Sequence, residues 1–132
     1  MEIIESDGKI IAIIYRSSDW VKGLNFITPR DLFIQVGSWW YNSGTKLASH
    51  VHRDINRVVS RTHEMTYVKN GSMKVILYDD DKKVIKEITL YQGDLAVYAF
   101  GGHGYEILED NTQIIEAKNG PFLSVEIDKE KF

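Results

Sequence analysis

The sequence has no cysteine, which excludes disulfide frameworks, zinc sites with thiolate ligands and cysteine nucleophiles. Proline occurs at only 2 positions, and hydrophobic residues make up 43% of the 132 residues, so the composition is that of a globular chain. Basic residues are in the minority, with 16 Lys and Arg against 19 Asp and Glu, so we expect no nucleic-acid partner. Neither a signal peptide nor a long apolar run is present, so we expect a cytoplasmic protein without a membrane-bound part.

Short apolar runs, each bounded by Gly, Asn or Asp, follow one another along the chain. Strand-sized runs at this spacing predict one all-β domain over residues 1–132, built as a sandwich or a closed barrel. Asn70-Gly71 is typical of a hairpin turn. Only residues 54–60 show a weak helical pattern. The expected strands are 10–15, 32–36, 65–68, 73–77, 84–90, 95–100, 105–108, 113–118 and 122–127.

The four histidines, at positions 50, 52, 63 and 103, are the most informative residues. His50 and His52 have the two-residue period that places both imidazoles on one face of a strand. Two neutral ring nitrogens on one face can bind the same divalent ion. Because the chain lacks cysteine, any further ligands would be His, Asp or Glu.

The order of these residues resembles the two sequence motifs of the cupins, small metal-binding β-barrels. The matching residues are the His50-Val51-His52 triplet, Glu64 with six residues before Gly71, then Gly93-Asp94 and His103. The motifs cover residues 46 to 108, and residues 101–110 and 115–122 are similar to a subgroup of small single-domain bacterial cupins without an assigned activity.

The resemblance implies an antiparallel jelly-roll β-barrel and a metal bound by His50, His52, Glu64 and His103. The ion would be iron, manganese, nickel or zinc, which the sequence does not distinguish. The chain departs from the family pattern in two places. Residues 53–63 lengthen the first motif, and Ala99-Phe100-Gly101-Gly102 stands where the family usually has a proline before the histidine of the second motif.

His63 and Glu64 are adjacent, so an unbulged strand points only one of them into the barrel. The spacing to Gly71 favours Glu64, with Thr66 and Val68 on the same inner face. His63 would then share the opposite face with Met65. His63 is the alternative ligand if a bulge shifts the register.

Several other residues are candidates for ligand binding or chemistry. Arg53, Arg57 and Arg61 recur every four residues; Arg57 and Arg61 are expected to bind a carboxylate or phosphate near the metal, the alternative being a solvated face. Trp39-Trp40-Tyr41 is expected to pack in the core, the alternative being a platform for a sugar ring.

The tyrosines at 67, 98 and 105 are candidate acid or base groups, and their spacing selects none of them.

The resemblance favours a metal-dependent isomerase or epimerase that acts on a sugar, a sugar nucleotide or a keto acid. An iron-dependent dioxygenase and a non-catalytic ligand-binding or sensing barrel are the alternatives, so catalysis itself stays open. The expected partner is a small molecule, anionic or carbohydrate. We also expect a homodimer that pairs through Ile10–Tyr15 or Trp39–Tyr41.

Overall fold

The computed structural model describes all 132 residues and consists mostly of antiparallel strands, which confirms the all-β prediction. The elements, in chain order, are β1 (Glu2–Ser6), β2 (Lys9–Tyr15), a short 3-10 helix (Ser17–Asp19), β3 (Gly23–Phe26), β4 (Gly37–Trp40), β5 (Glu64–Asn70), β6 (Ser72–Tyr78), β7 (Val84–Tyr91), β8 (Leu95–Tyr98), β9 (Gly102–Ile107), β10 (Gln113–Lys118) and α1 (Val125–Asp128). None of the helices is long and apolar enough to cross a membrane.

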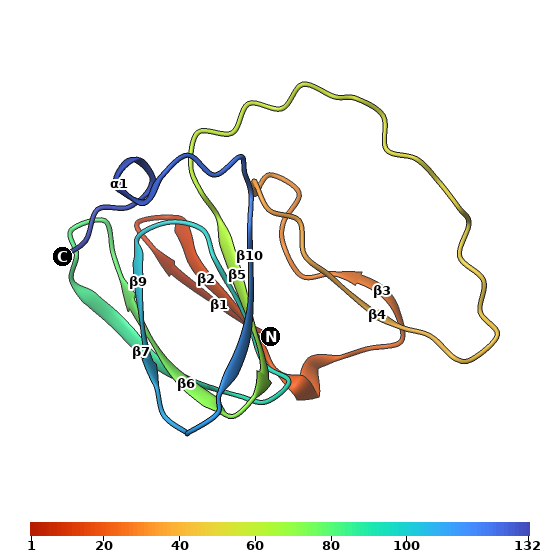
Figure 1. The fold of residues 1–132 in the computed structure, drawn as a ribbon, viewed down its shortest axis with the longest axis horizontal. Coiled ribbons are helices and arrows are strands. Elements are labelled where there is room, and N and C mark those ends of the chain that lie inside the picture. Colours follow the sequence, from red (N-terminus) through yellow and green to blue (C-terminus); the bar gives the residue numbers. More distant parts are fainter.

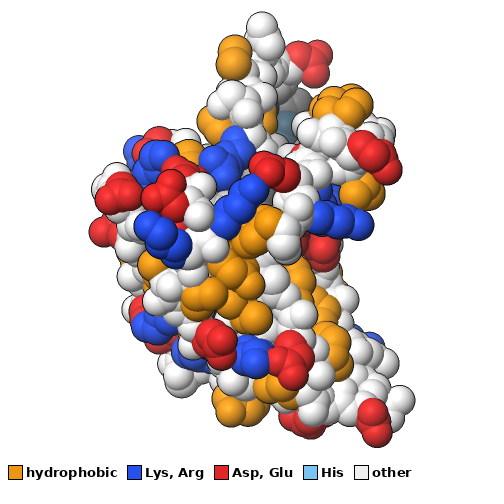
Figure 2. All heavy atoms as spheres, turned by 90° about the vertical axis from the view of Figure 1, so that its left-hand side faces the viewer, with side chains coloured by type: hydrophobic (Ala, Val, Ile, Leu, Met, Phe, Trp, Pro, Cys, Tyr) orange, Lys and Arg blue, Asp and Glu red, His pale blue; other side chains and the backbone are white.

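The strands form three sheets (Figure 1). A five-stranded sheet has the order β1-β2-β8-β5-β10, a three-stranded sheet has the order β7-β6-β9, and β3 pairs with β4 beside them. The two larger sheets bury one apolar cluster between them, with Val68 and Ala96 from the first and Val75 and Leu77 from the second. The outer face of the three-stranded sheet carries hydrophobic, basic and acidic side chains together (Figure 2).

Strand β2 lies inside the five-stranded sheet and is buried on both faces. Ala12 and Ile14 belong to the cluster between the two larger sheets. Ile13 and Tyr15 belong to a second cluster on the outer face, which the segment 27–36 covers. A strand buried on both faces explains the unbroken apolar run at residues 10–15. Because β2 also has β1 and β8 as neighbours, this strand offers no dimer surface, contrary to the first of the two expected interfaces.

The turn at Asn70-Gly71 is not a hairpin. It joins β5 of the five-stranded sheet to β6 of the three-stranded sheet, and these two strands do not pair. Gly71 has a φ of 78°, and a Cβ there would lie 2.3 Å from the Thr112 hydroxyl. The glycine therefore lets the chain turn a corner between sheets close to the loop that precedes β10.

Two of the expected strands are wrong. The segment 32–36 is irregular, and Leu32 and Val36 are buried against the outer face of the five-stranded sheet without strand pairing. The segment 122–127 contains the start of α1 instead, and Phe122 and Leu123 are exposed. Both segments are short apolar runs, and an apolar run does not by itself require pairing with a neighbouring strand.

Residues 41–62, here called the arm, contain no helix or strand (Figure 1). The arm leaves β4, passes around the outside of the sheets and returns to the start of β5. The strand expected at His50-Val51-His52 is therefore absent, and residues 54–60, which have weak helical character in the sequence, form no helix. Trp39 and Trp40 at the end of β4 and Tyr41 at the start of the arm are exposed by 55%, 46% and 41%, so the prediction that they pack in the core is wrong.

Candidate functional site

A cavity of about 1080 Å³ opens at one end of the two larger sheets. Its lining comes from the last residues of the arm, from strands of both sheets and from the C-terminal segment 119–132. The polar floor of the cavity is defined here as Glu64, Tyr98, His103 and Tyr105. The basic residues Arg57, Arg61, Lys82 and Lys129 are called the charged rim, and the acidic residues Asp79, Asp80, Asp128 and Glu130 line the cavity beside them.

Strand alternation in two opposed sheets brings the floor residues together. In β5, Glu64 and Thr66 are buried and point inward with Val68, as the sequence predicted. In β9, His103 and Tyr105 lie opposite Leu77 and Val75 of β6, which are themselves buried on the inner side. The two pairs therefore face each other across the space between the sheets.

The floor is a connected polar cluster. The Tyr105 hydroxyl donates a hydrogen bond of 2.8 Å to Glu64 Oε1. His103 Nε2 lies 3.5 Å from the same carboxylate oxygen. The Tyr98 ring stacks on the His103 imidazole, with centroids 4.5 Å apart, and its hydroxyl lies 2.9 Å from Thr66 Oγ1. Each polar group of the floor is thus oriented by a neighbour.

The ionisation of the floor follows from these contacts. Burial alone would raise the pKa of Glu64, but the hydrogen bonds with His103 and Tyr105 outweigh it and lower the pKa below 4.5, so Glu64 is a carboxylate at neutral pH. Burial raises the pKa of Tyr98 and of Tyr105 far above the ordinary tyrosine value, so both phenols keep their protons. The floor therefore combines one buried anion with two hydroxyl donors and one imidazole.

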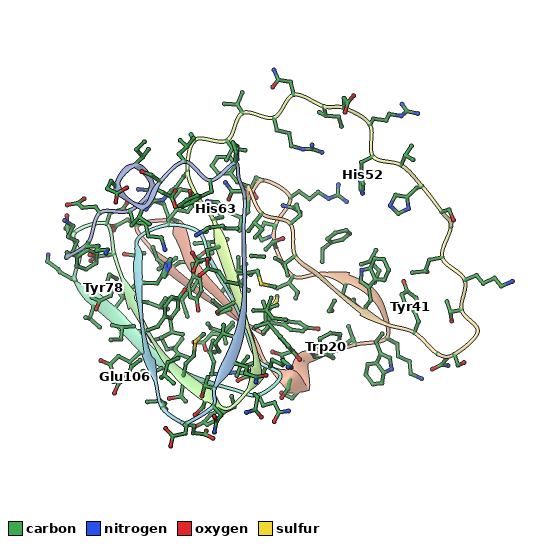
Figure 3. The ribbon with its side chains drawn as sticks, in the orientation of Figure 1. Trp20, Tyr41, His52, His63, Tyr78 and Glu106 are labelled. Atoms are coloured by element: carbon green, nitrogen blue, oxygen red, sulfur yellow. The ribbon has the colours of Figure 1, made fainter.

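The structure brings together two of the four residues expected to bind a metal. Glu64 and His103 are neighbours in the floor. His50 and His52 are exposed on the arm, with ring centroids 5.2 Å apart, and Figure 3 shows His52 out on the arm, away from the sheets. No group of three or more His, Asp or Glu side chains is arranged to hold a metal ion. One carboxylate and one imidazole do not fit the four-ligand set that the resemblance implies.

His63, the alternative ligand, lies at the base of the arm and is only 1% exposed (Figure 3). Its Nδ1 accepts a hydrogen bond of 3.2 Å from the Phe33 backbone N–H, and its ring packs between Phe33 and Phe100. Its Nε2 has no partner. Burial, and then the charge of Arg61, lower the pKa of His63, so the imidazole is neutral and holds segment 27–36 against the start of β5.

Both arginines expected to bind substrate line the cavity. Arg61 donates a hydrogen bond of 3.0 Å to the Gly101 carbonyl, and its guanidinium lies 5.4 Å from the centre of the Phe100 ring. Arg61 also lies 3.9 Å from Asp80 Oδ1, whereas Arg57 lines the cavity without an ion pair to an acidic residue. The ability of the two arginines to bind an anion stays a prediction.

Among the residues that match the second motif only His103 belongs to the floor, and the others support the cavity from outside the floor. The buried Asp94 carboxylate accepts hydrogen bonds from Arg16 and from the backbone N–H groups of Ser17 and Tyr91, so Gly93-Asp94 fixes the turn before β8. Gly101 has a φ of 63°, and a Cβ there would lie 2.1 Å from the Tyr78 carbonyl oxygen. A glycine at this position lets the chain enter β9 close to β6.

The C-terminal segment is the part of the site that the sequence did not indicate. Phe132 packs edge-on against Tyr78, with centroids 5.0 Å apart, and Asp128 accepts a hydrogen bond from the Thr62 hydroxyl at the end of the arm. Lys129 adds a positive charge near Glu64. These contacts join residues more than fifty positions apart, so no local pattern could have revealed them.

The chain matches no family model, no curated protein and no solved structure.

Proposed function

We propose that this protein is a cupin-like jelly-roll β-barrel that binds a small anionic sugar derivative or keto acid in its cavity and isomerises or epimerises it by proton transfer. The observation that carries the proposal is the buried Glu64 carboxylate, bonded to Tyr105 and lying beside His103 at the floor of the cavity. The sequence resemblance supports the fold, and the arrangement of the floor supports the chemistry.

The Glu64 carboxylate can stay buried and ionised at this place only because His103 and Tyr105 compensate for its burial. A buried carboxylate costs free energy unless a cation or several hydrogen bonds compensate for it. Glu64 is 3% exposed and makes no ion pair with a lysine or arginine. Ionised residues of this kind, in a cavity and with specific partners, are concentrated at functional sites. A stable apolar core would not need this group, which favours a catalytic or binding purpose.

The floor has the groups that proton transfer beside a carbonyl needs. Glu64 can accept a proton from the carbon next to the ligand's carbonyl, while His103 supplies a proton to the carbonyl oxygen, which gives a neutral enediol or enol. Transfer of the proton from Glu64 to the former carbonyl carbon, with the other enediol hydroxyl giving its proton to His103, completes an isomerisation and restores both residues. An epimerisation needs, in addition, a water molecule that protonates the original carbon from the face opposite Glu64, while the enol hydroxyl returns its proton to His103 and Glu64 releases its proton to solvent. Tyr105 is a positioning residue in this scheme, because its hydroxyl holds the Glu64 carboxylate.

Basic residues at the rim support an anionic ligand. Arg57, Arg61 and Lys129 line the mouth of the cavity together with the acidic Asp79, Asp80, Asp128 and Glu130. Arg61 and Lys82 are paired with Asp80 and Glu130, whereas Arg57 and Lys129 are in no ion pair and are the groups available to an anion. Guanidinium groups bind carboxylate and phosphate oxygens in pairs of parallel hydrogen bonds. A ligand with its anionic group at the rim and its carbonyl at the floor would have a polar partner for each of these two groups.

The test is exchange of carbon-bound hydrogen with solvent. We would incubate the protein in D₂O with a panel of sugar phosphates and 2-keto acids and follow deuterium uptake by NMR. Wild type and Glu5→Gln, a change at an exposed carboxylate of β1, should incorporate deuterium into at least one compound, and Glu64→Gln should not. Binding without exchange in all three proteins would favour the non-catalytic barrel instead.

A metal stays a prediction of the sequence resemblance, and it has its own measurement. Elemental analysis of the purified protein, with and without prior dialysis against a chelator, would find iron, manganese, nickel or zinc at one ion per chain if the prediction is right. Because the floor contributes only Glu64 and His103, the His50→Ala and His52→Ala variants should then lose the ion only if the arm closes onto the floor.

A further inference from the structure

The arm exposes an unusual number of apolar side chains. Leu47, Ile55 and Val59 are all exposed, and Val51 and Val58 are exposed by 88% and 86%. Neither of the two buried apolar clusters includes any of them. Single exposed apolar residues are ordinary, but five along one irregular segment point to a surface that is covered under other conditions.

These residues have the spacing of one face of a helix. At about 100° per residue, the six apolar side chains of residues 46–61 fall within an arc of about 120°. They are Leu47, Ala48, Val51, Ile55, Val58 and Val59. The basic residues of the same segment, Lys46, Arg53, Arg57 and Arg61, fall together on the other side. Residues 46–61 can therefore form an amphipathic helix of roughly 24 Å.

A helix of this length is marginal in isolation, and an apolar face must be buried to stabilise it. The charge of the chain indicates what buries it. Four basic residues and Asp54 give the arm a net charge of +3. Because the whole chain has a net charge of −3, the remainder has a net charge of −6. An anionic membrane would repel the rest of the chain, whereas a second copy offers the arm an acidic body.

A second copy also offers an apolar surface. Leu24 and Phe26 of β3 and Trp39 of β4 are exposed and lie on one face of this strand pair, and the arm begins directly after β4. Each copy therefore carries both an apolar arm and an apolar aromatic patch. Two such copies can cover each other about a two-fold axis, with each arm on the partner's patch.

We propose that residues 46–61 fold into an amphipathic helix by docking on the β3–β4 patch of a second copy of this chain. The inference does not rest on the proposed function, because no residue of the cavity floor takes part, but the helix would include Arg57 and Arg61 of the charged rim. Burial of the apolar face supplies the stabilisation, and attraction between the basic arm and the acidic remainder of the partner favours this pairing.

Analytical ultracentrifugation and far-ultraviolet circular dichroism of the full chain, over about 1 to 500 µM protein, test the proposal. A dimer should form as the concentration rises, and the helical signal at 222 nm should rise with it. The double variant Val51→Asp, Ile55→Asp should weaken dimerisation at least tenfold. Val84→Asp, at an exposed position of β7, should leave both measurements unchanged.

Several results would overturn the proposal. These are a monomer throughout the range, a dimer that the double variant does not weaken, or a dimer without added helix. A helical signal that rises with vesicles of anionic lipid and not with protein concentration would assign the arm to membranes instead. An unchanged near-ultraviolet spectrum of each variant would show that the sheets remain folded.

Discussion

The Tyr105 hydroxyl reaches Glu64 Oε1 at 2.8 Å, which links β9 of the three-stranded sheet to β5 of the five-stranded sheet. This contact joins the two sheets at the floor of the cavity, as does His103, which approaches the same oxygen and stacks on Tyr98. His103 and Tyr105 together let a carboxylate stay ionised where burial alone would favour its protonated form. The stability of the fold and the charge of the site therefore depend on the same few contacts.

Removing the Tyr105 hydroxyl should lower the stability of the fold and make Glu64 easier to protonate. Tyr105→Phe deletes the donor to Glu64, so we expect the free energy of unfolding to fall by about 1 kcal/mol and the pKa of Glu64 to rise. Urea unfolding at pH 7 measures the first effect, and NMR titration of the Glu64 side chain measures the second. Tyr91→Phe is the matched control, because Tyr91 is exposed and its hydroxyl makes no hydrogen bond. Equal stability of the two variants would contradict the expectation.

The ionisation of Glu64 should make the stability fall in acid. Its pKa in the folded protein is lower than the ordinary value of 4.5, so its contribution is fully present above pH 4.5 and is lost as the pH falls through the folded pKa. Thermal unfolding of the wild type and of Glu64→Gln between pH 7 and pH 3 should show a larger drop in Tm for the wild type. Parallel curves would show that Glu64 does not titrate in this range.

His63 should make the stability fall in mild acid. Its pKa in the folded protein lies below the ordinary value of 6.5, so the unfolded chain takes up a proton first as the pH decreases. We expect the free energy of unfolding to fall below pH 6.5, by at most about 1.4 kcal/mol per pH unit. In His63→Leu this part of the pH dependence should disappear, whereas His52→Leu, at an exposed position, should retain it. Unfolding by urea at pH 5.5, 6.5 and 7.5 gives the comparison.

Alanine substitutions at Gly101 and Gly44 distinguish the cost of a strained backbone from the cost of a steric clash. Both glycines have a positive φ, of 63° and 85°, but only at Gly101 would a Cβ meet another atom, the Tyr78 carbonyl oxygen at 2.1 Å. Gly44→Ala should therefore cost about 1 kcal/mol, and Gly101→Ala should cost at least about 2 kcal/mol more. Chemical denaturation of the two variants gives the difference. A similar loss in both would mean that the chain at Gly101 relaxes away from Tyr78.

The local features of this fold could be predicted from the sequence, and the pairing between distant segments could not. Alternation placed Glu64, Thr66 and Val68 on the inner face of β5, because strand periodicity depends only on neighbouring residues. The same reasoning read Asn70-Gly71 as a hairpin, since a turn signal does not say which sheet the next strand joins.

The candidate site shows the same division. His103 and Glu64 were predicted to share a site, and they are neighbours in the floor. Tyr105 could not be selected from among the tyrosines, because its contact with Glu64 spans 41 residues and two sheets. His50 and His52 were placed on a strand by their spacing alone, but the arm has no neighbouring strand with which to pair.

The cavity is built from parts that differ in how firmly they are held. Its floor stands on β5 and β8, each of which has a hydrogen-bonded strand on both sides, and on β9, an edge strand paired with β6. Its mouth is formed by the end of the arm and by the segment 119–132, which contain no strand. Local opening of a protein begins where backbone hydrogen bonds and buried contacts are few. Amide hydrogens of the mouth should therefore exchange with solvent long before those of the floor, so the entrance can adjust to molecules of different size while Glu64 stays in place.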